Sequence, residues 1–369
     1  MKKVLWSFLI LVAIFMGDPL IAMAEQQPLL ESEITEFDLK WPVEKSTGTT
    51  HEIAYNQQQP DDHILWVTGQ DYDYLAKVTL EEVKAEFFPM GEGSGPHGIL
   101  FDNNGNLWVS LEFTGIVAKI NQENGKLEQE IDVKLYAEEA PEPINTNPHG
   151  LGLDSDGKTI WFTGKKTNTI GKINLDDCCS VEHFELPTVG AVPIYIAAGP
   201  DGNMWCTELV GNNIARITSD GDVTEFKIPT YNSRPIAIVP GPDGQSMWFS
   251  EEAGRNVARI DMEGNITEFP VPLTQKNVIL AGMAFDQEGN LWTQSYVDAH
   301  NPFPEGQDYI IKFDKAIQYA NAGDLSNIPI TYYPVPSKKT IMHRIIQGPD
   351  NNIWFTELGI DKLGKLAEK

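Results

Sequence analysis

Four histidines of this chain stand at the start of short apolar segments: His51, His97, His149 and His343. A set of glutamates follows tryptophans by three or four residues: Glu112, Glu208, Glu251 and Glu357. An imidazole titrates near neutral pH and acts as a general base or acid, and a carboxylate is a ligand for a hard cation such as Mg²⁺. Brought together, these groups could remove a proton and stabilise the negative charge left behind. The fold decides whether they meet.

A repeat runs through the chain and carries these residues. Seven of the nine tryptophans share one local sequence context: Trp66, Trp108, Trp161, Trp205, Trp248, Trp292 and Trp354. Successive spacings are 42, 53, 44, 43, 44 and 62 residues. A period slightly above forty, built from short strands, is typical of β-propeller blades, and the two long spacings indicate insertions.

The clearest copy of the repeat runs from Pro193 to Thr230 and contains four strand candidates separated by turn residues. These are Tyr195–Ala198, Asn203–Thr207, Asn213–Ile217 and Val223–Ile228. Gly, Pro and Asp stand where the chain must reverse, and β-branched or aromatic residues stand between them. Each copy therefore predicts one four-stranded antiparallel blade.

The two ends of the chain predict how the ring closes. The last copy begins near Met342 and ends at Lys369 without its fourth strand, elsewhere ITEFPVP. A strand of that kind, Ile34–Leu39, stands near the N-terminus instead. We expect it to complete the last blade, because closure removes exposed sheet edges. The predicted fold is an all-β, seven-bladed propeller that forms a single domain over residues 25–369.

The repeat also predicts where the histidines lie. The first strand of each propeller blade lines the central channel, and its start holds His51, His97, His149 or His343 in four copies. Blades seven, one, two and three are consecutive in a closed ring, so these catalytic candidates should face one sector of the channel mouth. The alignment of His51 requires a four-residue turn insertion. The other three copies have Ile194, Ile236 and Ala281 at this position.

The end of strand two belongs to the same face of the disc and supplies the predicted metal ligands, Glu112 and Glu357. In blade two Glu112 lies roughly opposite His97, and in blade seven Glu357 lies similarly opposite His343. The two glutamates differ in register by one residue, so an unbroken strand would turn them to opposite faces. Glu208 and Glu251 are interpreted as repeat residues that bond to neighbouring loops.

Three insertions interrupt the repeat. The segments Tyr136–Asn147 and Asp298–Asp308 fall on the histidine-bearing face, where they are expected to wall the pocket and influence ligand choice. A third, Lys315–Asn327, falls on the opposite face and is expected to hold a short helix.

Several repeat units resemble one known family. The segments GPDGNMWCTELVGNNIARI, GPDGQSMWFSEEAGRNVARI and GPDNNIWFTELGIDKLGKL, together with ITEFPVP, resemble the virginiamycin B lyase (streptogramin lyase) family over roughly Ile34 to Leu366. The resemblance implies a seven-bladed propeller that opens a cyclic depsipeptide antibiotic by elimination at its ester bond, with Mg²⁺ at the channel mouth. Such an activity would confer antibiotic resistance.

The family's catalytic histidine lies in a PHGI segment and is followed by a glutamate four residues beyond the blade tryptophan. His97 and Glu112 match this pattern. The family places the pair in its last blade, where this chain has His343 and, one residue early, Glu357. The family's second histidine comes from the preceding blade, a position that His51 fills for His97.

Two departures from the family concern the last blade and the metal. The position of the second histidine is Ala281 when His343 is taken as the first. The family's metal-binding glutamate just before the PHG segment is replaced by Gly95 in blade two and by Ile341 in blade seven.

The lyase hypothesis assigns His97 as the base that removes a proton next to a carbonyl. Glu112 would hold Mg²⁺ together with water or a second carboxylate, and His149 or His343 would protonate the leaving group. Two alternatives remain open: an exported ligand- or protein-binding propeller without catalysis, and a metal-dependent lactonase or esterase. The expected ligand is a small molecule or a cyclic peptide.

Composition and the N-terminus bound the other expectations. Residues 1–24 combine two lysines, an apolar run and Ala22-Met23-Ala24, the pattern of a secretory signal, so the protein is expected in the periplasm or outside the cell. A net charge of −26 disfavours nucleic-acid binding. A monomer without a membrane anchor is expected. The cysteines Cys178, Cys179 and Cys206 form no disulfide framework, although one bridge is possible.

Overall fold

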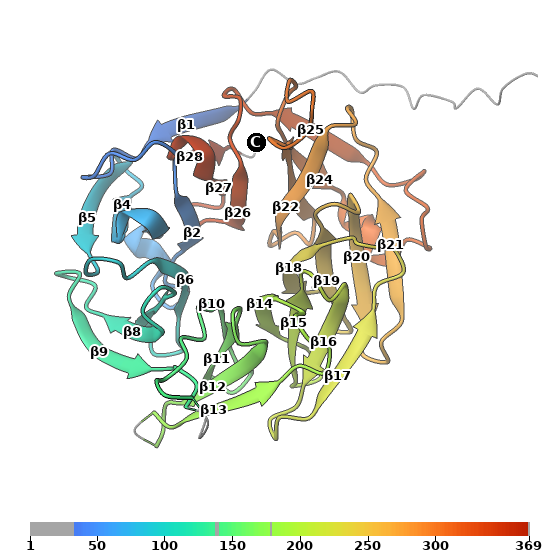
Figure 1. Cartoon of the computed structure of the whole chain (residues 1–369). Helices are drawn as coiled ribbons and strands as arrows, with labels where there is room; N and C mark the ends of the chain where they lie inside the picture. Colours follow the sequence, from blue (N-terminus) through green and yellow to red (C-terminus); the bar gives the residue numbers. More distant parts are fainter. Residues whose placement is uncertain (1–32, 137–139, 178, 368–369) are drawn as a thin grey trace, which may run out of the picture.

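The computed structural model describes residues 33–136, 140–177 and 179–367. Seven four-stranded antiparallel sheets follow one another around a central channel, which confirms the predicted seven-bladed propeller (Figure 1). The signal-like segment at residues 1–24 and Cys178 lie outside the described residues. Within the described ranges, no helix is both long enough and apolar enough to span a bilayer.

The blades follow chain order, and strand one of each lies nearest the channel. Blades one and two comprise β2 (Thr50–Ala54), β3 (Ile64–Gly69), β4 (Tyr74–Thr79), β5 (Lys84–Pro89), β6 (Pro96–Phe101), β7 (Leu107–Leu111), β8 (Ile116–Ile120) and β9 (Leu127–Asp132). Blades three and four comprise β10 (Pro148–Leu153), β11 (Thr159–Gly164), β12 (Thr169–Asn174), β13 (Val181–Glu185), β14 (Pro193–Ala198), β15 (Met204–Glu208), β16 (Asn213–Ile217) and β17 (Val223–Lys227).

Blades five and six comprise β18 (Pro235–Pro240), β19 (Ser246–Glu251), β20 (Asn256–Asp261), β21 (Ile266–Pro270), β22 (Val278–Phe285), β23 (Leu291–Val297), β24 (Tyr309–Phe313) and β25 (Ile330–Pro334). Blade seven comprises β26 (Met342–Gln347), β27 (Ile353–Glu357), β28 (Lys362–Leu366) and β1 (Ile34–Asp38). Four 3₁₀ segments complete the assigned elements: η1 (Pro60–Asp62), η2 (Gln70–Tyr72), η3 (Lys315–Tyr319) and η4 (Leu358–Ile360).

The ring closes as the two chain ends predict. Strand β1 pairs antiparallel with β28, with Ile34 opposite Leu366 and Asp38 opposite Lys362, so the first strand of the chain is the outer strand of the last blade (Figure 1). Phe37 of β1 stacks on Trp354 of β27, with ring centroids 5.9 Å apart. The closure therefore joins the termini through both backbone pairing and side-chain packing.

The repeated tryptophan holds each blade together. Trp248 on β19 stacks on Phe269 of β21, with centroids 5.7 Å apart, and Trp205 on β15 stacks on Phe226 of β17 at 5.6 Å. A basic side chain from strand three covers the ring, as Arg216 does for Trp205 at 5.6 Å. Such contacts combine a large buried apolar area with a cation–π attraction. The tryptophans are therefore packing residues and lie away from the channel.

A β-bulge at one place in strand one sets the geometry of the channel wall. The register shifts between Pro96 and Ile99 in β6, and the same shift occurs in the first strand of every other blade. In β2 it lies between Thr50 and Ile53, so His51 aligns with His97, as predicted. A bulge inserts one extra residue and breaks the two-residue alternation of a strand. Two consecutive side chains can therefore turn toward the channel.

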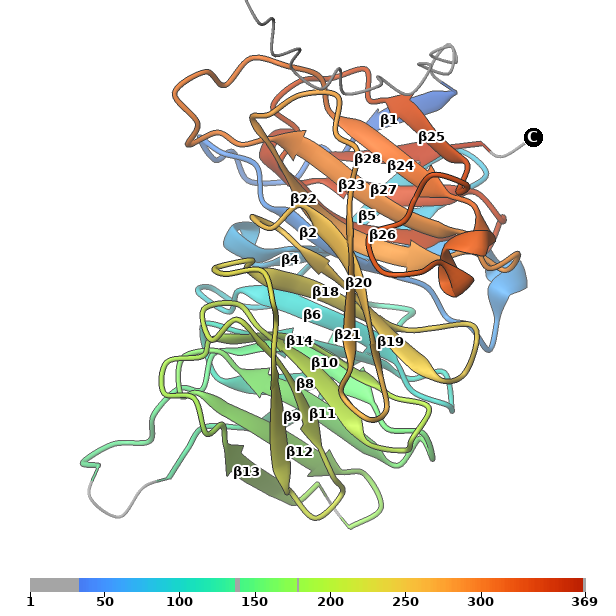
Figure 2. The ribbon, with the colours of Figure 1, turned by 90° about the vertical axis from the view of Figure 1, so that its right-hand side faces the viewer.

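The insertions lie where the repeat places them. The connection from β9 to β10 is described at residues 133–136 and 140–147, where a bridge joins Leu135 to Ile144. Residues 298–308 connect β23 to β24, and the described parts of both connections lie on the same side of the disc (Figure 2). The third insertion contains η3, so its short helix is of the 3₁₀ type. Of the described cysteines, Cys179 and Cys206 are free thiols, and Cys206 is buried between blades three and four.

Candidate histidine site in the central channel

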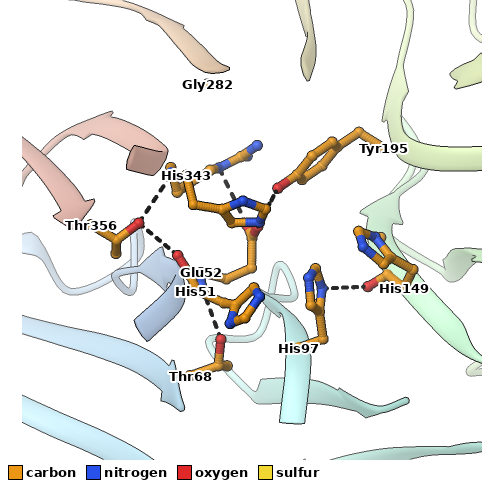
Figure 3. A network of polar contacts seen from close by, with 12 residues as sticks. His51, Glu52, Thr68, His97, His149, Tyr195, Gly282, His343 and Thr356 are labelled. Atoms are coloured by element: carbon orange, nitrogen blue, oxygen red, sulfur yellow. Dashed lines mark hydrogen bonds and ion pairs between the residues drawn. The ribbon is translucent and has the colours of Figure 1, made fainter. Parts of the chain in front are cut away.

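The structure brings the four predicted histidines together. His51, His97, His149 and His343 form what we call the histidine cluster, and they face one another across one sector of the channel (Figure 3). Ring centroids are 5.1 Å apart for His51 and His97, 3.8 Å for His97 and His149, and 4.9 Å for His51 and His343. Their roles stay predictions, but their convergence from four blades is a property of the fold.

Backbone carbonyl groups orient three of the rings. Nδ1 of His51 lies 2.8 Å from the Thr49 carbonyl oxygen, and Nδ1 of His97 lies 3.3 Å from the carbonyl of His149. His149 repeats the pattern, with Nδ1 3.3 Å from the carbonyl of Ile194. A carbonyl only accepts, so each Nδ1 carries the proton and each Nε2 keeps a lone pair for another partner.

Glycine after the histidine makes this arrangement possible. A β-carbon built at Gly98 would lie 2.3 Å from the His149 carbonyl oxygen, and one built at Gly150 would lie 2.4 Å from the Ile194 carbonyl. Only glycine lets adjacent channel strands approach this closely. The PHG sequence thus combines a channel histidine with the backbone room needed to anchor its neighbour.

Burial lowers the pKa of His51, His97 and His149. Burial, and then the charge of nearby His343, lowers the pKa of His51 to about 3. Burial and the neighbouring His149 lower the pKa of His97 well below its ordinary value, and burial and the Lys165 charge do the same for His149. Neutral imidazoles accept protons or bind metals, and protonated ones do neither.

A second set of channel residues was missed by the sequence analysis. It consists of Glu52, Tyr195 and His343, which Figure 3 labels, together with Arg344, and we call it the channel network. The Tyr195 hydroxyl donates to a Glu52 carboxylate oxygen and lies 3.0 Å from Nε2 of His343. Nε2 of His343 lies 3.1 Å from Oε1 of Glu52, and Nε of Arg344 lies 3.4 Å from Oε2. The network joins blades one, four and seven.

The network fixes the charges around its buried carboxylate. Burial alone would raise the pKa of Glu52, but the Arg344 guanidinium and the His343 contact outweigh it and hold the pKa below its ordinary value. Burial and the Glu52 charge raise the pKa of Tyr195, so its hydroxyl stays protonated. The sequence signal for these residues was the position that directly follows the histidine position in each blade. There Glu52, Tyr195 and Arg344 replace the small residues of the other blades.

Glu112 lies beside the histidine cluster, and both of its carboxylate oxygens already have polar partners. One of its oxygens accepts from Nε2 of Gln70 at 2.6 Å, and the other lies 3.3 Å from Nζ of Lys165. Burial raises the pKa of Glu112, and the Lys165 charge and its hydrogen bonds oppose this shift. Its carboxylate, His97 and His149 offer ligand atoms within 4.8 Å of one another.

Glu357 does not join the cluster. It ends β27 opposite Met342 on one side and Lys362 on the other, and its buried carboxyl oxygens find no hydrogen-bond partner among the described residues. Burial and the Glu36 charge raise its pKa to about 8. Its unbroken strand turns it away from the channel, whereas Glu112 stands one residue later in its own blade. The metal-binding role of Glu357 stays a prediction.

The donor set around the cluster does not suit Mg²⁺. Two groups have ligand atoms within 4.8 Å of one another: His51 with His97 and His343, and His97 with Glu112 and His149. Mg²⁺ requires oxygen ligands in near-octahedral geometry. These sets offer one carboxylate, which Lys165 and Gln70 already engage. Gly95 and Ile341 supply no carboxylate at the position before the channel strand.

Comparison with known proteins agrees with this architecture. The model of the virginiamycin B lyase family matches residues 120–300. A curated virginiamycin B lyase from Nocardia farcinica is 30% identical over 130 residues, which cover 35% of this chain and only 40% of that protein's length.

Solved structures cover more of the molecule. Virginiamycin B lyase from Staphylococcus aureus is 27% identical, with a TM-score of 0.71, over 92% of this chain and all of that one. A second structure of it, a catalytically inactive variant with quinupristin, matches equally well. A streptogramin B lyase structure, 23% identical, shares the fold with a TM-score of 0.70 over 90% of this chain and 97% of its own. With the closed ring of seven blades, these likenesses show that the chain is a virginiamycin B lyase-like β-propeller.

Proposed function

We propose that this protein is a carbon–oxygen lyase that opens an ester-linked cyclic peptide at the histidine cluster. The observation that carries the proposal is the convergence of His97 with three further imidazoles at one end of the channel-lining strands. The S. aureus relative supports it, because a histidine-to-alanine variant of that lyase is catalytically inactive and is seen with quinupristin.

His97 has the features that a base in this reaction needs. Its Nδ1–H is anchored on the His149 carbonyl, which leaves the lone pair of Nε2 available to accept a proton. In the proposed step Nε2 takes the proton from a carbon next to a carbonyl. The electron pair of that C–H bond forms a C=C bond, and the C–O bond on the adjacent carbon breaks. General-base catalysis contributes about 10²–10⁴ in rate.

The leaving group of this reaction needs no general acid. The acyl oxygen of an ester departs as a carboxylate, which needs no added proton at neutral pH. His149 then acts as a positioning residue, because its carbonyl orients His97. Lys165 supplies positive charge beside the cluster, since its charge lowers the pKa of both His51 and His149. We assign it to stabilising the negative charge that develops on the carbonyl oxygen as the proton is removed.

Incubation with quinupristin, followed by mass spectrometry, tests this proposal. Elimination gives a linear product of unchanged mass that contains an alkene, whereas a lactonase or esterase adds one water. His97→Ala should lower turnover at least about a hundredfold with an unchanged melting temperature. The matched control is His300→Ala on an exposed loop of the same face. Turnover that persists in His97→Ala would contradict the assignment. No product from the wild-type chain with any ester-linked cyclic peptide would favour a binding propeller.

A further inference from the structure

We propose that His51, His97 and His343 form a binding site for a borderline transition-metal ion such as Zn²⁺. The three imidazoles come from blades one, two and seven, and one ligand nitrogen of each lies within 4.8 Å of the other two. This inference does not rest on the proposed reaction. It concerns a metal that the family resemblance did not imply.

The second contact of each ring is the main evidence. Metal-ligating histidines almost always donate their other ring N–H to a backbone carbonyl or a carboxylate. Nδ1 of His51 contacts the Thr49 carbonyl at 2.8 Å, and Nδ1 of His97 contacts the His149 carbonyl at 3.3 Å. Nε2 of His343 contacts the Glu52 carboxylate at 3.1 Å. Each ring therefore has one nitrogen anchored by an acceptor and a lone pair on the other.

The chemistry of the donors selects the metal. Three imidazole nitrogens suit Zn²⁺, Cu²⁺, Ni²⁺ or Fe²⁺, whereas carboxylate and carbonyl oxygens suit Mg²⁺ or Ca²⁺. A tetrahedral zinc site with bonds of about 2.0–2.1 Å separates its ligand nitrogens by about 3.3 Å. The three ligand nitrogens lie within 4.8 Å of one another, so binding an ion requires small side-chain rotations that bring them to this spacing. The proposed ion is therefore held by three protein ligands, with the fourth position left for water.

Surrounding groups favour this set over the alternative one. His97, Glu112 and His149 also approach one another, but Lys165 lies 3.3 Å from Glu112 and opposes a cation there. The Lys165 charge also reaches His51, but this set does not depend on the carboxylate that Lys165 engages, and the Arg344 guanidinium beside His343 is paired with Glu52. His51 and His343 are partly exposed and His97 is buried, so water can reach the outer side of the site.

Metal binding and the proposed base reaction compete for one atom. Nε2 of His97 carries the lone pair that either a metal or a substrate proton would take. The metal-loaded protein should therefore eliminate slowly, and a chelator should restore turnover. Metal titration needs no substrate, so failure of the lyase proposal leaves this inference untouched.

The test is a titration of the full chain, expressed without a histidine tag and stripped with EDTA. Co²⁺ is added while its visible ligand-field bands are recorded, and Zn²⁺ affinity is then measured against a chromophoric chelator. Wild type should bind one ion, with bands typical of four-coordinate cobalt, and Mg²⁺ should not compete. His51→Ala and His343→Ala should each weaken Zn²⁺ binding more than about a hundredfold, beyond the effect expected for a supporting partner.

Controls separate the site from other histidines and from loss of folding. His300→Ala and His183→Ala should bind Zn²⁺ like wild type, because both lie outside the cluster. Glu52→Gln should weaken binding about 10–100-fold, because it removes the carboxylate behind His343. Each variant is compared at an equal folded fraction, measured by its melting curve. No one-to-one binding by the wild type, or unchanged affinity in both His51→Ala and His343→Ala, would overturn the inference.

Discussion

The buried carboxyl of Glu251 in blade five should make the stability of the protein depend on pH, and replacing Glu251 with glutamine should remove this dependence. Glu251 ends β19 with its side chain buried. Oε2 accepts from Nδ2 of Asn256 at 2.8 Å, and Oε1 has no hydrogen-bond partner among the described residues. Burial, together with the nearby Glu268 charge, raises its pKa to about 8.

The sign of the effect follows from proton linkage. Below the ordinary pKa of about 4.5 the carboxyl is protonated in both states, and its stabilising effect is complete. Between pH 4.5 and 8 the unfolded chain loses this proton while the folded protein keeps it. The free energy of unfolding therefore falls with rising pH, by about 1.4 kcal/mol per pH unit. The loss is about 3 kcal/mol at pH 7 and levels off above pH 8.

Urea denaturation of wild type and Glu251→Gln at pH 5, 6, 7 and 8 measures this difference. Glutamine has nearly the same shape and stays neutral, so the stability of Glu251→Gln relative to wild type should increase by about 4 kcal/mol between pH 5 and pH 8. The control is Glu263→Gln, because Glu263 is exposed in the same blade. A difference between Glu251→Gln and wild type that stays constant from pH 5 to pH 8 would refute the reasoning.

The remaining predictions concern the channel wall and the ring closure. Gly98→Ala would place a β-carbon 2.3 Å from the His149 carbonyl, so urea denaturation should show a loss of about 1–3 kcal/mol. If the lyase proposal holds, Gly98→Ala should also lower turnover per folded molecule, because the same carbonyl orients His97. An unchanged free energy of unfolding would contradict the packing argument. Deleting residues 33–39 would leave β28 without its outer partner, and thermal melts with size-exclusion chromatography should report lower stability and self-association. A monomer with an unchanged melting temperature would show that β1 is dispensable.

Much of the fold could be predicted from local patterns. A blade is a local unit, because its turns, its tryptophan and its β-branched strands lie within about forty residues of one another. Closure was predictable as well, since one strand was missing at the C-terminus and one of its kind stood at residues 34–39. The column of histidines followed from the same repeat.

The tertiary structure decided how the channel side chains meet. The bulge in strand one ends the alternation of faces, so the sequence did not show that Glu52, Tyr195 and Arg344 would also enter the channel. Their contacts join residues up to 292 positions apart, which no local pattern records. Glu112 and Glu357 differ in register by one residue, and such a shift turns a strand side chain to the opposite face.

The sequence by itself determined a closed ring of seven blades and a sector of histidines, because both repeat with a fixed local period. Only the tertiary structure decided which side chains share the channel, which carboxylates are already paired and which histidines lie within ligand distance of one another. Those properties depend on distances between blades and on burial, and neither is encoded within a single repeat.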